Sequence, residues 1–148
     1  EMPQDLATLL EHVVHDLQRI SAMPIQLALP TPAEPVRALI DPDAFAILVR
    51  NLIENALKHG ATDSAVEVSL SHNGLLRVIN AGSLVPAADL AQLTQRFVRG
   101  NSWAEGFGLG LAIAATIAQG VGAELAFASP ATGRAEGFEA KVQFRLAP

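Results

Sequence analysis

Apolar side chains recur at steps of three and four residues over residues 5–20, which is the spacing of an amphipathic helix. The stripe consists of Leu6, Leu9, Leu10, Val13, Val14, Leu17 and Ile20. Pro24 ends this helix, and the alternating apolar residues that follow predict a strand over 25–29. A cluster of three prolines then marks a loop, and a second short strand is expected over 36–40.

A second helix has sequence signals at both of its ends. Asp41 followed by Pro42 predicts its start, because an Asp side chain accepts hydrogen bonds from first-turn N–H groups and proline loses nothing at that position. We expect the helix to run to His59, with Gly60 as its left-handed cap.

The rest of the chain predicts a β-hairpin and then a mixture of helices and strands. The hairpin covers 66–79, with Asn73-Gly74 as its two-residue turn. The later elements are a short helix over 87–93, a polar stretch over 99–105, a helix over 109–119 capped by Gly120 and Gly122, and closing strands over 125–128 and 138–146. We therefore expect one α/β domain, a two-layer sandwich in which a mixed sheet of about five strands packs on three helices.

Composition limits the classes of protein to which this chain can belong. Its 148 residues suit one domain, and 50% hydrophobic with 17% charged residues excludes disorder. No apolar run reaches the roughly 18 to 20 residues of a membrane span. A net charge of −5 with only ten basic residues argues against nucleic-acid binding, and the absence of cysteine excludes disulfides and thiolate zinc sites. The polar start, without a signal peptide, is what we expect of a domain cut from a longer chain.

Polar side chains on the second helix form the first candidate site. Asn51, Asn55 and Lys58 share one face at helical spacing, although asparagine is a mediocre helix former. A carboxamide oxygen suits Mg²⁺, and a lysine one turn further on suits phosphate. The same stripe is also compatible with an ordinary solvated helix face.

A glycine-rich segment, GFGLG at 106–110, leads directly into a helix and forms the second candidate site. Glycine lets the backbone approach a ligand, and the N–H groups of a helix start attract anions. The segment does not follow a strand and no GxxxxGK[ST] occurs, which excludes Rossmann and P-loop sites and leaves a packing role as the alternative. NAG at 80–82 and RFVR at 96–99 are either ordinary loops or parts of the same site.

Taken in their order along the chain, these segments resemble the ATP-binding catalytic domain of bacterial sensor histidine kinases, in the superfamily that includes gyrase and mismatch-repair ATPases. NLIENALKHG resembles the N box, INAG the first glycine box, QRFVRG the F box and GFGLGLAIA the second glycine box. The resemblance extends over roughly residues 6–146. It implies the Bergerat fold, a mixed sheet backed by three helices, with ATP bound between the N-box helix and a lid.

The resemblance also implies roles for the matched positions. Asn55 would hold Mg²⁺ and act with Lys58 in catalysis, while Asn51 and His59 would lie at the phosphates. The first glycine box would contact the base, the F box would support the lid and the γ-phosphate, and the second glycine box would cradle the triphosphate. The ATP-binding positions implied in these three boxes are Asn80, Gly82, Arg96, Phe97, Arg99, Gly106, Gly108, Leu109, Gly110 and Leu111.

The first glycine box departs from the family pattern. The usual box begins with an Asp whose carboxylate accepts a hydrogen bond from the adenine amino group, whereas this chain has Asn80, and Leu84 replaces the second glycine. An Asn oxygen still accepts that bond, but without the added strength of a charged acceptor. We therefore expect weaker adenine binding.

No segment resembles a His-Glu-x-x-x-Pro phosphoacceptor box, since His12 and His15 lack its acidic neighbour and its proline. The resemblance therefore implies that residues 1–148 form one domain that donates the γ-phosphate of Mg-ATP to a histidine on a separate dimerisation domain. The domain would be cytoplasmic, in an inner-membrane-anchored sensor kinase with a downstream response regulator, and would contact neither membrane nor nucleic acid. Alone it would have little autokinase activity. The alternatives are a serine-kinase anti-sigma factor of the same fold and a degenerate nucleotide-binding module that signals by association.

Overall fold

The computed structural model describes residues 2–31, 34–91 and 108–148. Its long helices are α1 (Leu6–Ile20), α2 (Pro42–His59) and α4 (Gly108–Gly120), and residues 87–91 are also helical. The strands of the described part are β1 (Pro3–Asp5), β2 (Ile25–Ala28), β3 (Arg37–Leu39), β4 (Val66–Leu70), β5 (Leu75–Asn80), β6 (Glu124–Ala128) and β7 (Phe138–Gln143). No helix in these ranges is long and apolar enough to cross a bilayer.

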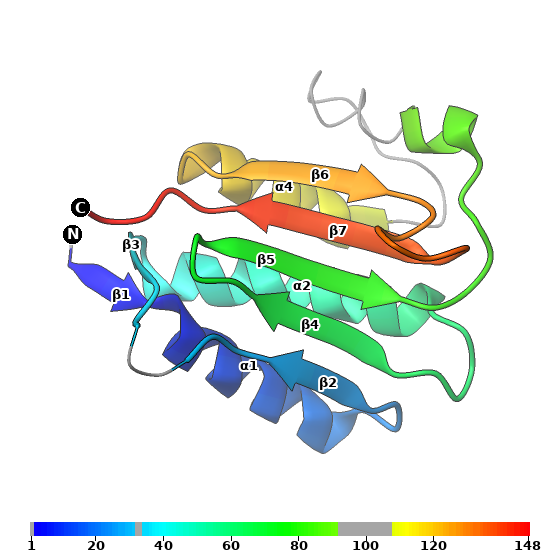
Figure 1. Ribbon diagram of the computed structural model, residues 1–148, viewed down its shortest axis with the longest axis horizontal. Helices are drawn as coiled ribbons and strands as arrows, with labels where there is room; N and C mark the ends of the chain where they lie inside the picture. Colours follow the sequence, from blue (N-terminus) through cyan, green and yellow to red (C-terminus); the bar gives the residue numbers. More distant parts are fainter. Residues whose placement is uncertain (1, 32–33, 92–107) are drawn as a thin grey trace.

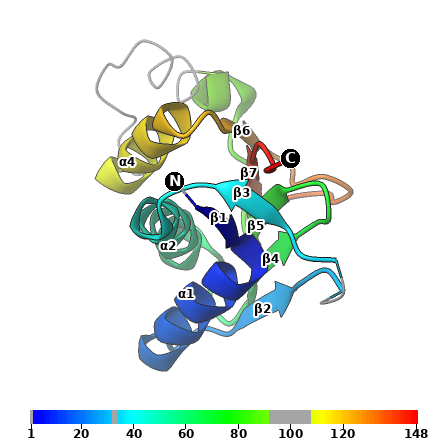
Figure 2. The same ribbon diagram turned by 90° about the vertical axis from the view of Figure 1, so that its left-hand side faces the viewer.

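Five strands form one mixed sheet in the order β2-β4-β5-β7-β6 (Figure 1). The β2–β4 pair is parallel and the other neighbours are antiparallel. The three long helices lie on one side of this sheet, as Figure 2 shows, and the other face carries no helix in the described part. The predicted two-layer sandwich is confirmed.

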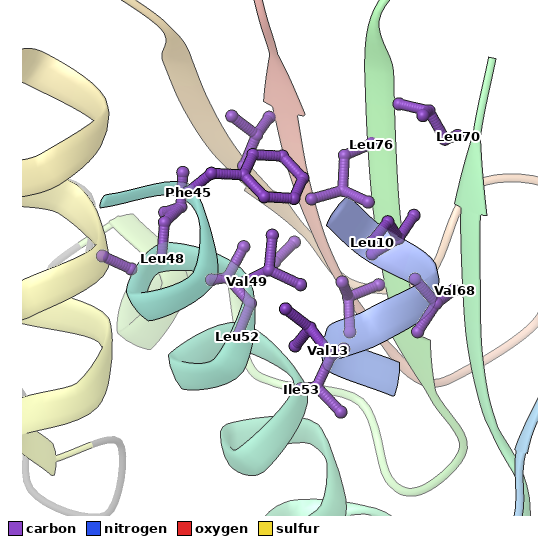
Figure 3. Close-up of a cluster of buried hydrophobic side chains, with 14 of the residues drawn as sticks. Leu10, Val13, Phe45, Leu48, Val49, Leu52, Ile53, Val68, Leu70 and Leu76 are labelled. Atoms are coloured by element: carbon purple, nitrogen blue, oxygen red, sulfur yellow. The ribbon is translucent and has the colours of Figure 1, made fainter. Parts of the chain in front are cut away.

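The hydrophobic core lies between the helices and the inner face of the sheet (Figure 3). Phe45 of α2 is wholly buried in this core, and its ring centroid lies 5.4 Å from that of Phe144. Burying a side chain of this size stabilises the fold by about 1.5–3 kcal/mol. Its neighbours in the cluster include Leu10 and Val13 of α1, Leu48, Val49, Leu52 and Ile53 of α2, Val68 and Leu70 of β4, and Leu76 of β5.

The predicted helix starts are confirmed, but the predicted end of α2 is wrong in one respect. Asp5 caps α1 by accepting from the Ala7 N–H at 3.2 Å, and Asp41 caps α2 by accepting from the Asp43 N–H at 3.0 Å. Gly60 follows α2 with φ −70°, so it is not a left-handed cap. Close packing excludes a larger residue there instead, because a β-carbon on Gly60 would lie 2.8 Å from the Ala56 carbonyl oxygen.

The hairpin turn between β4 and β5 is longer than predicted. Ser71 N–H donates to the Leu75 carbonyl at 3.0 Å, which leaves His72, Asn73 and Gly74 in the loop, so the two-residue turn is wrong. Gly74 takes φ +86°, the left-handed conformation required of a three-residue hairpin loop.

The end of α4 agrees with prediction, with Gly122 rather than Gly120 as the left-handed residue. Gly122 has φ +74°, and the Ala123 N–H donates to the Ala118 carbonyl at 2.8 Å, as in a Schellman cap.

The short strand predicted over 36–40 forms as β3, but it belongs to a second, two-stranded sheet. Its partner is β1, with Gln4 opposite Ala38, a strand that the sequence does not predict. Three residues of the sequence PQD carry too little alternation to reveal a strand. β3 is also bonded at its other side, since the Ala147 N–H donates to the Arg37 carbonyl at 2.7 Å.

Candidate functional site

The start of α4 packs against the middle of α2 at Gly110 and Asn51. A β-carbon built on Gly110 would lie 3.2 Å from the Asn51 Oδ1, so the two helices approach there at a glycine. The Asn51 Nδ2 donates to the Ile47 carbonyl at 2.8 Å, which orients the carboxamide. Leu111 is wholly buried in the core, and it anchors the first turn of α4 beside this contact.

The polar stripe on α2 is not uniformly solvated. Asn51 is half-buried, Asn55 is only 8% exposed and Lys58 is exposed. The interpretation of this stripe as an ordinary solvated face is therefore wrong for Asn55. Glu54 is exposed, on a different row of the helix from Asn55.

His59 and Lys58 stand side by side at the end of α2. Partial desolvation of the ring and, secondly, the positive charge of Lys58 lower the pKa of His59 below its ordinary 6.5. The imidazole is therefore neutral at pH 7 in the described structure. A neutral ring can donate one hydrogen bond and accept another, while the lysine supplies the positive charge at this end of the helix.

Asn80, the last residue of β5, has a buried acceptor without a partner. Its side chain is 4% exposed, and its Nδ2 donates to the Ala81 carbonyl at 3.1 Å. The Oδ1 has no hydrogen-bond partner in the described structure. An unsatisfied buried acceptor costs about 1–3 kcal/mol, so such an atom is expected to meet a donor in the working protein.

The end of α2 lies directly against Asn80. A β-carbon on Gly60 would be 3.3 Å from the Asn80 Cβ, and the Ala61 N–H donates to the Ala81 carbonyl at 2.9 Å. Gly82 follows with φ +137°, in a conformation that favours glycine. The segments that resemble the N box and the first glycine box therefore meet, although they are distant in the sequence.

Only part of the predicted site can be located. Asn51, Asn55, Lys58 and His59 lie along the second half of α2, with Gly110 at one end of this row and Asn80 and Gly82 at the other. The backbone of Gly108 and Leu109 forms the start of α4. Arg96, Phe97, Arg99 and Gly106 lie outside the described residues.

Two polar residues near Asn80 were missed by the sequence analysis. Glu139 is wholly buried although it stands on the face of β7 that alternation assigns to solvent. The Arg77 Nε donates to its Oε2 at 2.5 Å and the Thr132 N–H to its Oε1 at 2.8 Å. Ser129 accepts from the Val85 N–H at 2.8 Å and donates to the Gly137 carbonyl at 2.6 Å. No local pattern distinguishes either residue, because Arg77 is 62 residues from Glu139 and Val85 is 44 residues from Ser129.

Comparison with known proteins decides the family. A model described as "Histidine kinase-, DNA gyrase B-, and HSP90-like ATPase" matches residues 40–148. The chain belongs to this family. As a domain of this ATPase family, it carries the ATP-binding role that the family description states, and all the located site residues fall within the matched region.

One curated relative of the ATPase domain is a sensor protein. "Sensor protein QseC" of Escherichia coli K12 is 33% identical over 141 residues, which cover 94% of this chain and 30% of QseC. The domain thus spans about a third of the length of this relative. The solved cytoplasmic segment of histidine kinase QseC has a TM-score of 0.69 at 23% identity and covers 99% of this chain and 78% of that one.

Two mycobacterial structures match over nearly their whole length. The mycobacterial sensor histidine kinase MprB has a TM-score of 0.78 at 20% identity, over 99% of this chain and 98% of that one. The ATP-binding domain of PrrB from Mycobacterium tuberculosis has a TM-score of 0.69 at 26% identity, over 99% and 97%. The fold of the ATPase domain is therefore that of histidine kinase catalytic domains.

Proposed function

We propose that this domain binds Mg-ATP along the second half of α2 and donates the γ-phosphate to a histidine on a separate dimerisation domain of a two-component sensor kinase. The observation that carries the proposal is the buried, unpartnered Asn80 Oδ1, held against the end of the same helix that bears Asn55 and Lys58. A base would bind at Asn80, and the phosphates would extend along α2 toward the start of α4.

The base end of the site fits an adenine. The amino group of adenine is a donor, and Asn80 offers an acceptor that the described residues leave unsatisfied. The Asn80 Nδ2 is already engaged by the Ala81 carbonyl, which fixes which of the two amide atoms faces the ligand. Guanine presents a carbonyl oxygen at the corresponding position, and two acceptors would then meet without a proton between them.

The phosphate end fits a magnesium triphosphate. No group of three or more His, Asp or Glu side chains within the described ranges could hold a metal, so Asn55 would share Mg²⁺ with phosphate oxygens. When bound, the ion would supply charge neutralisation at the β- and γ-phosphates. Lys58 adds a positive charge one turn further on, and the backbone N–H groups at the start of α4 suit the same anion.

The residues along α2 favour transfer to a protein group over hydrolysis. Activation of water needs a general base, and the carboxamide of Asn51 cannot take up a proton. Its Nδ2 is tied to the Ile47 carbonyl, and the only carboxylate between Asn51 and Lys58, that of Glu54, is exposed on another row of the helix. Catalysis in this domain would therefore rest on positioning and charge neutralisation, with the acceptor histidine supplied from outside.

The relatives support the wider setting. They are sensor proteins and histidine kinases, and the solved QseC fragment is described as a cytoplasmic segment. We infer that residues 1–148 act as a single catalytic domain, located in the cytoplasm, of a membrane-anchored sensor kinase with a response regulator as the final acceptor. The domain alone would have little autokinase activity, because no phosphoacceptor box occurs in the chain.

Calorimetry of the domain with Mg-ATP, and incubation with γ-labelled ATP and the histidine-bearing domain of the same kinase, test the proposal. We expect Mg-dependent binding and label on the histidine domain. Asn55→Ala should reduce both by at least about tenfold, because even the loss of an outer-shell partner of a metal ligand costs about that much. Asn73→Ala, in the exposed hairpin turn, is the matched control and should change neither.

Two outcomes would contradict the proposal in different ways. An absence of binding at millimolar Mg-ATP would overturn the nucleotide site altogether. Binding without label on the histidine domain would reject the kinase activity and favour a module that signals by association. Label on a serine of a partner, rather than on a histidine, would favour the anti-sigma type of kinase.

A further inference from the structure

The hydroxyl of Ser129 joins two backbone segments that are remote in the sequence. It accepts a hydrogen bond from the Val85 N–H at 2.8 Å and donates one to the Gly137 carbonyl at 2.6 Å. Ser129 is half-buried and begins the connection between β6 and β7. This connection, residues 129–137, is named the strap here, and it lies on the sheet face opposite to the helices (Figure 2).

Both partners of Ser129 belong to segments that adjoin Asn80. Val85 ends the segment that begins at Ala81, directly after Asn80 and through Gly82. Gly137 lies against the Asn80 backbone, since a β-carbon on it would be 2.8 Å from the Asn80 carbonyl oxygen. The next residue, Phe138, is the β7 partner of Asn80 in the sheet register. The Ser129 hydroxyl thus links the segment 81–85, which follows Asn80, to Gly137, which packs against the Asn80 backbone.

The strap that carries Ser129 is itself held firmly. The Thr132 N–H donates to the buried Glu139 at 2.8 Å, and Arg134 forms an ion pair with Glu67 of β4 at 2.7 Å. Ala131 of the strap is itself buried. Ser129 therefore lies on a segment that is anchored to β4 and β7, and Val85, at the end of the segment 81–85, is bonded to it.

We propose that Ser129 is a positioning residue for base recognition: its hydroxyl holds the segment 81–85 against the start of β7, so that the Asn80 Oδ1 stays buried and aimed at the base. This inference rests on the proposed nucleotide site. Ser129 itself touches neither base nor phosphate in this scheme. Its removal should therefore weaken contacts at the base and leave contacts at the phosphates unchanged.

Comparison of two ligands separates these effects. The affinity of the domain for Mg-ATP is measured by calorimetry, and that for Mg-tripolyphosphate, which lacks the base, by its competition against ATP. Ser129→Ala leaves the Val85 N–H and the Gly137 carbonyl without their shared partner. We expect it to weaken ATP binding by about tenfold, the effect of one lost hydrogen bond, and to leave tripolyphosphate binding within about twofold.

Three further variants make the result specific. Ser129→Thr keeps the hydroxyl and should restore ATP affinity to within about twofold of the parent chain. Ser129→Cys keeps the shape of serine with a weaker donor, so it gives an intermediate loss and serves if the alanine variant does not fold. Arg134→Ala is the matched control, because it removes an exposed ion pair from the same strap without touching Val85 or Gly137.

The outcomes distinguish this inference from the proposed function. If the parent chain binds ATP while Ser129→Ala and Ser129→Cys bind it equally well, the positioning role is overturned and the nucleotide site stands. An equal loss of ATP and tripolyphosphate affinity in those variants overturns it too, because it indicates a general structural effect. A parent chain that binds no ATP overturns both proposals.

Discussion

The α-carbon of Gly110 on α4 faces the side-chain oxygen of Asn51 on α2, so that a β-carbon at position 110 would lie only 3.2 Å from that oxygen. Separations of this size are tighter than most contacts of a real β-carbon, and the neighbouring group must shift by a few tenths of an ångström. Asn51 has little freedom to do so, because its Nδ2 is bonded to the Ile47 carbonyl at 2.8 Å. The glycine therefore fixes how closely α4 approaches the polar stripe of α2.

Gly110→Ala is expected to weaken Mg-ATP binding while leaving the stability of the domain nearly unchanged. Alanine is the better residue inside a helix by roughly 0.5–1 kcal/mol, which offsets the cost of the tighter contact. The free energy of unfolding should therefore stay within about 1 kcal/mol of the parent chain, while displacement of Asn51 and of the start of α4 weakens Mg-ATP binding severalfold. Urea unfolding and calorimetry measure the two quantities.

Gly120→Ala provides the control for that substitution. Gly120 is the last residue of α4, and nothing lies within 4 Å of a β-carbon built there. This variant should gain stability from helix propensity alone and bind Mg-ATP as the parent does. If Gly110→Ala also binds Mg-ATP as the parent does, the close approach of α4 to Asn51 is not needed for nucleotide binding.

The buried pair of Glu139 and Arg77 makes the stability of the domain depend on pH. Burial alone raises the pKa of Glu139, but hydrogen bonds from Arg77 and Thr132 outweigh it and lower the pKa below its ordinary value of 4.5. A carboxyl with a lowered pKa in the folded state stabilises the fold above its unfolded pKa. That stabilisation is present above about pH 4.5 and is lost as the pH falls through the folded pKa.

Glu139→Gln should abolish this pH dependence and destabilise the domain at pH 7 by about 2 kcal/mol. The loss stays below the 3–5 kcal/mol of a fully buried pair, because the Arg77 side chain is 30% exposed and keeps part of its hydration. Urea unfolding at several pH values between 3 and 7 measures it, with Glu67→Gln in the exposed pair with Arg134 as the control. Parallel stability curves for Glu139→Gln and the parent chain would show that the pair does not set the pH dependence.

Lys58 contributes to the lowered pKa of His59. Desolvation is the larger cause and survives a change at position 58, while the repulsion from the lysine charge does not. Lys58→Met should therefore raise the pKa of His59 without returning it fully to 6.5. An NMR titration of the imidazole signals measures the shift, and Lys141→Met, which removes the same charge from β7, is the control. An unchanged His59 titration in Lys58→Met would contradict the assigned cause.

Local signals made most of the fold predictable, and the failures occurred where remote contacts decide the structure. Asp41, Pro42 and the apolar periodicity of α2 act within a few residues, so both bounds of that helix followed from the sequence. The conformation of Gly60 did not, because this C-cap residue has extended backbone with φ −70° and lies between Ala56 and Asn80, which is 20 residues further along the chain. The strand β1 was equally invisible, since its partner β3 lies more than thirty residues away.

In the candidate site, too, local signals were predictable from the sequence and remote contacts were not. The order of the four motifs predicts Asn51, Asn55 and Asn80 as site residues, but no periodicity indicated that Asn55 would be buried or that the Asn80 Oδ1 would lack a partner. Ser129 and Glu139 carried no signal at all. Alternation along β7 places position 139 toward solvent, and only the strap folded over that face makes it a buried site.

Asn80→Asp tests the expectation that the amide at position 80 weakens adenine binding. The Asn80 Nδ2 donates to the Ala81 carbonyl at 3.1 Å, and a carboxylate oxygen in its place would face that carbonyl with no proton between them. The unliganded variant should therefore lose about 1–3 kcal/mol of stability. A charged acceptor makes a stronger hydrogen bond to the adenine amino group, so affinity for Mg-ATP and preference over Mg-GTP should both rise.

Asn80→Asp is expected to lower the stability of the unliganded domain and to raise its affinity for Mg-ATP. Measuring both quantities therefore tests the contact between Asn80 and the base. Thermal unfolding without nucleotide should show a lower midpoint than the parent chain, and saturating Mg-ATP should raise the variant's midpoint by more than it raises the parent's. Asn80→Ala removes the acceptor altogether and should lose both affinity and base preference. If Asn80→Asp is destabilised while its ATP affinity and its preference over GTP stay unchanged, the buried Oδ1 does not contact the base, and another group must satisfy it.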